Sequence, residues 1–168
     1  MNALQPAGTA VELRASLQIR KTAMSNYLFN DKNIAWQQLG EFENFRYSIL
    51  NIDQDSKIVD VIFKFEPHDP IILHRHRALN HTFVIHGEHR LYHANGELKA
   101  ARAVGSYTIS HPDPIPHREC GGDEGAIVLF SIRGTEGVMY ELLDDEENII
   151  ATLSMQDFVG LYEMNNRM

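Results

Sequence analysis

The sequence predicts a single all-β domain, built as a barrel or sandwich of short antiparallel strands. Short apolar stretches recur from Trp36 onward at intervals of roughly 8–12 residues, and several of them alternate apolar and polar positions. Glycine, proline and asparagine lie between these stretches, where turns are expected. The chain of 168 residues contains 43% hydrophobic and 23% charged residues, a balance that suits one globular domain.

The first four expected strands follow from these patterns. Phe45–Leu50 is the first, and Ile58–Phe65 is the second, in which alternate apolar residues face one side of the sheet. Two prolines between residues 66 and 70 end the second strand, because proline cannot donate to a sheet ladder. Ile71–His76 and His81–His86 are the third and fourth expected strands.

Turn signals separate the strands that come next. We expect Gly87-Glu88 to form a turn into a strand at His89–His93, and Asn95-Gly96 to form a hairpin leading to Glu97–Arg102. The remaining strands are expected at residues 107–110, 125–133 and 138–142. Strands of this length and spacing are typical of an all-β barrel or sandwich.

The two ends of the chain differ from this pattern. Residues 1–30 are weakly patterned and are expected to form an N-terminal arm, so the barrel domain is expected at residues 31–168. Near the other end, Ser154 is followed three positions later by Asp157, a combination typical of a helix start. Apolar residues after Asp157 predict a short C-terminal helix with one apolar face.

Charge, hydropathy and cysteine content exclude several classes of function. The net charge is −8, from 15 basic and 23 acidic residues, which argues against nucleic-acid binding through phosphate contacts. We see no apolar stretch long enough to span a membrane and no secretory signal, so no membrane partner is expected. Cys120 is the single cysteine, which rules out an intrachain disulfide and favours a cytoplasmic location.

The main functional signal is a cluster of histidines in the middle of the chain. All nine histidines lie between His68 and His117. Residues two apart in a strand point to the same face, so His74 and His76 should project side by side. Two imidazoles at that spacing can bind one metal ion at about 2.0–2.2 Å each. A third must come from elsewhere, and His117 follows a proline-rich loop that can fix its position.

These residues carry a resemblance to the cupin superfamily. His74-Arg75-His76, followed by the segment from His81 to Glu88 with its glycine, resembles the first cupin motif. Gly105 through His117 resembles the second motif. Trp36 with the following Leu39-Gly40 is similar to the start of one subgroup, which includes acetylacetone-cleaving and 2,4′-dihydroxyacetophenone-cleaving dioxygenases and the cupin domain of an anti-sigma factor.

The resemblance implies a jelly-roll type double-sheet barrel that forms a homodimer and binds one metal through His74, His76 and His117. Two departures from the pattern leave the ligand set open. His81 occupies the position of the usual glutamate ligand, so the site has either three histidine ligands or four with His81. The second motif is one residue longer than usual and lacks its Pro-x-Gly, which makes His111 the alternative to His117.

The function that the resemblance implies is that of a non-haem Fe(II) dioxygenase cleaving a C–C bond in a small ketone or β-dicarbonyl compound. Neutral imidazoles leave the charge of a divalent ion uncompensated, so an anionic chelating substrate and O₂ are the expected partners. Two alternatives stay open. One is a non-catalytic metal-binding or ligand-sensing cupin, and the other is a zinc- or nickel-dependent lyase, hydrolase or isomerase.

Further residues are candidates for the substrate pocket, and none is assigned as a catalytic acid or base. Phe83 and Tyr107 are strand aromatics that can line the inner face of a small barrel. His111 lies in the proline-rich loop, and His93 can reach the cavity as a hydrogen-bond donor to a ligand. His89 is interpreted as a solvent-facing residue of the hairpin.

Overall fold

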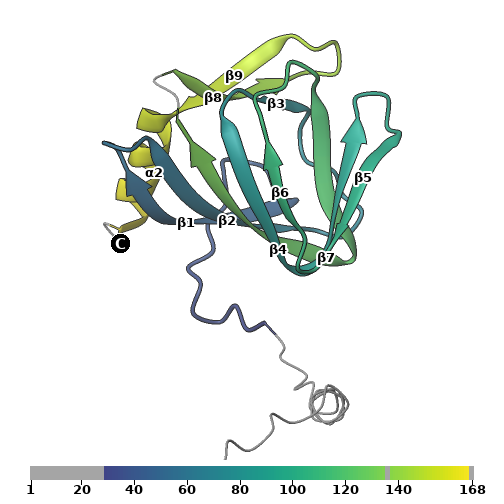
Figure 1. Ribbon diagram of the computed structural model, residues 1–168, viewed down its shortest axis with the longest axis horizontal. Helices are drawn as coiled ribbons and strands as arrows, with labels where there is room; N and C mark the ends of the chain where they lie inside the picture. The colour runs from purple at the N-terminus through teal and green to yellow at the C-terminus, as the bar shows by residue number, and fades with distance from the viewer. Residues whose placement is uncertain (1–28, 135–136, 167–168) are drawn as a thin grey trace, which may run out of the picture. The chain divides into compact units, whose positions relative to one another are not determined.

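The barrel is organised around two long strands, β4 (Leu79–His93) and β7 (His117–Arg133), which pair along most of their length. The computed structural model describes residues 29–134 and 137–166 and is shown in Figure 1. The chain divides into two units, Met1–Asn30 and Asp31–Met168, and the fold below is that of the second. The arm predicted at residues 1–30 lies outside the described residues, apart from its last two positions.

Every pairing between named strands is antiparallel in this part of the chain. β7 also pairs with β2 (Ile58–Phe65) and with β3 (His74–His76), and β2 pairs with β1 (Phe45–Asp53). β4 pairs with two short strands, β5 (Leu98–Ala103) and β6 (Tyr107–Ser110). β8 (Val138–Leu143) lies between β3 and β9 (Ile149–Ser154). The resulting sheet curls into a half-barrel, with β5 and the C-terminal helix α2 (Met155–Asn166) on opposite sides (Figure 1).

The core fills the inside of this curl. Alternate residues of β2 and β7 are fully or almost fully buried there, including Val59, Val61, Val128, Phe130 and Ile132. This is the period-two pattern that predicted the second strand. The buried residues of β7 belong to the apolar stretch that predicted the strand ending at Arg133. Burying their side chains removes apolar surface from water and stabilises the fold.

Helix α2 begins where the sequence predicted a helix start. The carboxylate of Asp157 accepts hydrogen bonds from the backbone N–H and the hydroxyl of Ser154, at 2.7 and 2.6 Å. These bonds satisfy groups that the first helical turn leaves without partners. Phe158 is buried in the core, so the short C-terminal helix is confirmed together with its apolar contact.

Three strand predictions need correction. His81–His86 and His89–His93 belong to one strand, β4, because Gly87 forms an irregularity within the strand and not a hairpin turn. β7 begins at His117 and not at residue 125. β9 was not expected, since its sequence Ile149–Ser154 follows an acidic run and its first four residues are exposed.

Gly87 is required for the close approach of the β4 and β7 backbones. Its φ of 66° lies in the left-handed region, and a Cβ at this position would overlap the backbone carbonyl oxygen of Gly125. The sheet registers shift on either side of it, between Val84 and His86 and between Gly87 and His89. This irregularity reverses which alternate residues of β4 face the interior, so residues after Gly87 can face the functional site.

No helix in the described residues is long and apolar enough to cross a membrane.

We expect Gly87→Ala to lower the free energy of unfolding by about 2–4 kcal/mol, because it adds a backbone clash to an unfavourable φ. Gly96→Ala is the matched control, since Gly96 also has a positive φ of 85° but no atom within 4 Å of the added Cβ. It should cost only about 1–2 kcal/mol. Urea unfolding of both variants measures the difference, and equal losses would contradict the proposed clash.

Candidate metal centre

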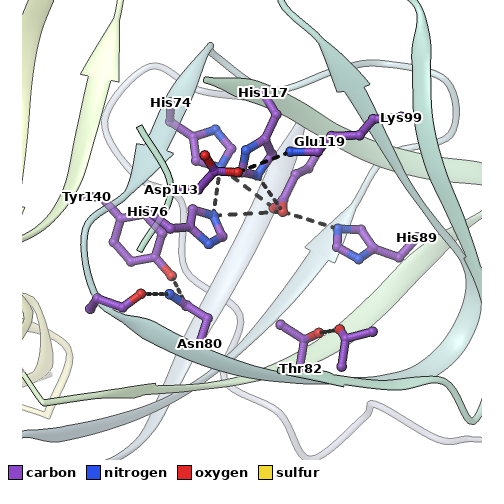
Figure 2. Close-up of polar contacts among 12 residues, drawn as sticks. His74, His76, Asn80, Thr82, His89, Lys99, Asp113, His117, Glu119 and Tyr140 are labelled. Atoms are coloured by element: carbon purple, nitrogen blue, oxygen red, sulfur yellow. Dashed lines mark hydrogen bonds and ion pairs between the residues drawn. The ribbon is translucent and has the colours of Figure 1, made fainter. Parts of the chain in front are cut away.

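Four buried side chains from two neighbouring strands meet inside the barrel. They are His74 and His76 of β3, and His117 and Glu119 of β7, and their nearest donor atoms all lie within 4.8 Å of one another (Figure 2). Each is only 3–5% exposed. Such a group of imidazoles and a carboxylate can hold a metal ion.

The strand geometry explains why these residues converge. His74 is paired directly with His117 across β3 and β7. Because side chains two apart share a face, His76 and Glu119 point into the same space as their neighbours. β3 is held on its other side by β8, through Leu142, Glu141 and Tyr140. The site therefore rests on backbone pairing on both sides of β3.

The distances between four pairs of donor atoms lie near those expected around a single ion. The Nε2 atoms of His74 and His76 are 3.1 Å apart, and Nε2 of His117 is 3.3 Å from Oε1 of Glu119. Nε2 of His74 and of His76 each lie 3.9 Å from the Glu119 carboxylate. Four donors arranged tetrahedrally at about 2.0–2.2 Å from an ion would lie about 3.3–3.6 Å from one another.

The protonation of His74 also suits metal binding. Its Nδ1 lies 2.9 Å from the backbone carbonyl oxygen of Ile72, which can only accept a hydrogen bond. Nδ1 therefore carries the proton, and the lone pair of Nε2 points into the cluster. A backbone carbonyl that fixes the tautomer of a histidine in this way is common at metal sites.

Burial and mutual repulsion keep the two imidazoles of β3 neutral. Burial, followed by the neighbouring charge of His117, lowers the pKa of His74 to about 4. The same two causes hold the pKa of His76 well below its usual value. Burial alone would raise the pKa of Glu119, but attraction to His89 and the hydrogen bond from His117 outweigh it and hold that pKa well below its ordinary value. His74 and His76 thus present neutral nitrogens and Glu119 an ionised carboxylate, the forms that bind cations.

A fourth histidine lies behind Glu119. His89 is fully buried, its Nε2 is 3.6 Å from Oε1 of Glu119, and its ring stacks on Phe65 with centroids 5.3 Å apart. Neither of its nitrogens has a hydrogen-bond partner in the part of the chain that the structure describes. The solvent-facing interpretation of His89 is therefore wrong, because the irregularity at Gly87 turns the following residues of β4 around.

Tyr140 and Asn80 pack beside the cluster. The Tyr140 ring lies edge-on to that of His76, with centroids 4.8 Å apart, and its hydroxyl donates a 2.6 Å hydrogen bond to Oδ1 of Asn80 (Figure 2). Nδ2 of Asn80 donates in turn to the carbonyl oxygen of Ala78. Burial and the charge of Glu119 raise the pKa of Tyr140 well above its usual value, so its hydroxyl remains protonated. These hydrogen bonds hold the Tyr140 ring in place, and the Tyr140 ring limits the movement of the His76 ring.

Two cavities reach the cluster from opposite sides. The smaller one, of about 70 Å³, is almost wholly apolar and is bounded by His74, Glu119 and residues of β1, β2 and α2. The larger one, of about 390 Å³, is bounded by His76, His117, Glu119 and polar residues of β5 and of the loop after β6. The larger volume is in the range of small-molecule sites, whereas the smaller suits a diatomic gas or a short alkyl group.

Several predicted site residues lie elsewhere. His81 is not part of the cluster: it lies on the outer face of β4, where Nδ1 is 2.5 Å from the hydroxyl of Tyr107. Phe83 and Tyr107 are 42% and 58% exposed and line an outer groove with His81, so they do not line the metal cavity. In β4 the reason is strand alternation, which points Asn80 and Thr82 inward and the alternate residues His81 and Phe83 outward.

His111 and His93 take intermediate positions. His111 lines the larger cavity without joining the four clustered residues. His93 is half-buried at the end of β4, opposite His117, and lines neither cavity. Glu119 was missed, although its position two residues after His117 is the same spacing that pairs His74 with His76.

Comparison with known proteins supports the fold assignment. The sequence matches no protein-family model and no curated protein. Among solved structures, an RmlC-like cupin from Ralstonia eutropha is 14% identical, with a TM-score of 0.66 over 84% of this chain and 87% of that one. An acetylacetone dioxygenase from Acinetobacter johnsonii is 13% identical, with a TM-score of 0.62 over 98% and 99% of the two chains.

A more distant structural match is a DMSP lyase from Ruegeria pomeroyi, which is 19% identical, with a TM-score of 0.51 over 65% of this chain and 60% of that one. At these identities the matches establish the fold alone. The chain has a cupin fold that resembles acetylacetone dioxygenase, as the histidine motifs predicted.

We expect His76→Ala to lose stoichiometric metal while keeping the β-rich far-ultraviolet circular dichroism spectrum. It removes one of four donors, whereas the core of β2 and β7 is unchanged. His81→Ala is the control, because that ring lies on the outer face. Elemental analysis of both purified variants measures the effect, and equal metal content would contradict the donor set.

We also expect the metal-free protein to lose stability as the pH falls from 6.5 toward 4. The pKa of His74 is about 4 in the folded chain and 6.5 in an ordinary setting, so protons bind the unfolded chain first. The stability from this group is complete above pH 6.5, and about 3 kcal/mol of it is lost by pH 4. Urea unfolding across this range tests the prediction. His74→Gln should flatten the pH dependence, and the exposed-site variant His68→Gln should not.

Proposed function

We propose that this chain is a metal-dependent oxygenase that uses Fe(II) and O₂ to cleave a C–C bond in a small β-dicarbonyl compound. The observation that carries the proposal is the buried group of three histidines and one glutamate, opening onto a cavity large enough for such a compound. The likeness to an acetylacetone dioxygenase along nearly the whole of both chains supports it.

The donor set suits the ion that this chemistry needs. A bound Fe(II) ion would supply the positive charge that binds an enolate and a path for electrons from the substrate to O₂. In the overall reaction, both oxygen atoms enter the products as one C–C bond breaks, giving a carboxylic acid and a 2-oxoaldehyde from a 1,3-diketone. Electrons pass from carbon to O₂, so no external reductant is required.

The protein residues set the charge of the site. His74 and His76 are neutral and Glu119 is ionised, so a divalent ion among them would keep a net positive charge. A positive centre in a buried space favours an anionic enolate over the neutral diketone. The carboxylate of Glu119 borders both cavities, so its negative charge lies beside whatever either cavity holds.

The surrounding residues orient the cluster and exclude water. The Tyr140–Asn80 hydrogen bond holds the edge of the His76 ring, and the Tyr140 hydroxyl, already donating, is not needed as an acid. The apolar cavity behind His74 is lined by aromatic rings of β1, β2 and α2. It offers a dry space beside the cluster for O₂ or for an alkyl end of the substrate.

Three expectations from the sequence remain proposals. They are the homodimer, the absence of nucleic-acid and membrane partners, and the cytoplasmic location.

The test is O₂ consumption by protein loaded anaerobically with Fe(II), Zn(II) or Ni(II) and then given acetylacetone in aerated buffer. We expect one O₂ consumed per diketone cleaved, with Fe(II) alone. Loss of an outer partner of a metal ligand commonly costs 10–100-fold in activity, so His76→Ala should lower the rate by more than about 100-fold. His81→Ala should retain it.

Turnover that proceeds without O₂, or with Zn(II) alone, would contradict the oxygenase and favour a lyase, the activity named for one of the structural matches. Stoichiometric metal with no turnover of any diketone would favour a metal-binding or sensing role.

A further inference from the structure

One cationic side chain faces the larger cavity without a protein partner. Arg102 lies on β5 directly opposite His89 of β4, so both side chains point to the inner face of the sheet. Arg102 is half-buried and lines the cavity together with His76, His117 and Glu119. Its neighbour on the same face is Ala100, whose small side chain leaves the guanidinium accessible from the cavity.

Arg102 differs from the other arginines of the barrel. It is the one arginine among residues 29–134 and 137–166 with neither a hydrogen bond nor an ion pair to a protein group. The others each bond to a carboxylate, a backbone carbonyl or a hydroxyl: Arg46, Arg75, Arg77, Arg90, Arg118 and Arg133. Lys99, on the same strand, pairs with Asp113 at 3.6 Å (Figure 2).

The setting of Arg102 makes an unpaired guanidinium costly. Burial lowers the pKa of Arg102 while the charge of Glu119 raises it, so the two groups interact without the 4.0 Å contact of an ion pair. A guanidinium stays charged in proteins, and removing a charge from water is costly unless an opposite charge pairs with it. The cavity is the space from which that charge can come.

We propose that Arg102 binds a carboxylate of the substrate, so that the substrate is a small β-dicarbonyl compound that also carries a carboxylate group. This inference rests on the proposed function and names its substrate class. A planar guanidinium recognises a carboxylate through two parallel hydrogen bonds, which also fix its orientation.

A count of charges around the cavity agrees with a dianionic substrate. A divalent ion with ionised Glu119 and neutral histidines leaves one positive charge, and Arg102 adds a second. Lys99 and Asp113 cancel each other. An enolate that carries a carboxylate has two negative charges, one for the metal centre and one for Arg102. The volume of about 390 Å³ accommodates such a molecule.

A pair of matched compounds tests this. Acetylacetone and 2,4-dioxopentanoate have the same five-carbon dicarbonyl chain, and a carboxylate replaces one methyl group in the second. The full chain is loaded with Zn(II), which keeps the divalent charge without redox chemistry, and each compound is titrated by calorimetry. We expect tighter binding of 2,4-dioxopentanoate. Arg102→Gln should weaken the binding of 2,4-dioxopentanoate by about 10–100-fold, the usual range for one lost charge-assisted contact. It should leave the affinity for acetylacetone unchanged.

Two further variants complete the design. Arg102→Lys keeps the charge but loses the two-pronged contact, so its affinity for 2,4-dioxopentanoate should lie between those of the other two proteins. Arg133→Gln, on the exposed end of β7, should bind both compounds as the unmodified chain does. Zinc content and circular dichroism confirm that each variant keeps its site and fold. If Arg102→Gln fails to fold, Arg102→Lys carries the comparison, with a selective loss for 2,4-dioxopentanoate expected.

The other outcomes separate the two proposals. Equal binding of both compounds by the unmodified chain would overturn the carboxylate site and leave the dicarbonyl function standing. An equal loss for both compounds in Arg102→Gln would show that Arg102 supports the site without reading a carboxylate, which also overturns the inference. A zinc-loaded chain that binds neither compound would overturn both.

Discussion

The barrel has one central constraint, which is that several imidazole nitrogens are packed around one buried carboxylate. The Nε2 atoms of His74 and His76 lie 3.1 Å apart, and the carbonyl of Ile72 fixes the tautomer that aims the first lone pair inward. Neutral acceptors packed this closely, with Glu119 beside them, are stable when a cation lies among them. The short strand β3 can present these groups because it is paired on both edges, with β7 and with β8.

The same cluster divides the interior of the barrel into two chemically different spaces. Aromatic and aliphatic residues bound most of the space toward α2, and a guanidinium, an ion pair and three histidines line the space toward β5. Glu119 borders both cavities, so its carboxylate interacts electrostatically with a charged group in either of them. Because the two cavities differ in polarity, we expect the substrate to bind in one orientation. Its charged end would lie toward Arg102, and its apolar end or O₂ toward the aromatic rings.

The sequence predicts this arrangement as far as strand alternation remains regular. His74 and His76 follow from residues two apart sharing a face, and the all-β barrel with its C-terminal helix follows from apolar periodicity and the Ser154–Asp157 start. The prediction that His81 is a metal ligand does not fit the structure, because β4 is regular at that point and directs the side chain of Asn80 inward. The prediction that His89 faces solvent is wrong because two register shifts around Gly87 reverse the alternation of β4. The irregularity at Gly87 involves a close approach to Gly125, which lies far along the chain. Glu119 was missed because its strand was expected to begin at residue 125, whereas β7 begins at His117 and gives Glu119 the same face two residues later.

The most direct test of the central claim is an anomalous-difference map, calculated from a crystal of the purified protein at the absorption edge of its bound metal. The account predicts one strong peak per chain, at about 2.0–2.2 Å from Nε2 of His74, His76 and His117 and from a carboxylate oxygen of Glu119. A map without a peak at this position, with the rings turned apart or hydrogen-bonded to one another through water, would contradict it.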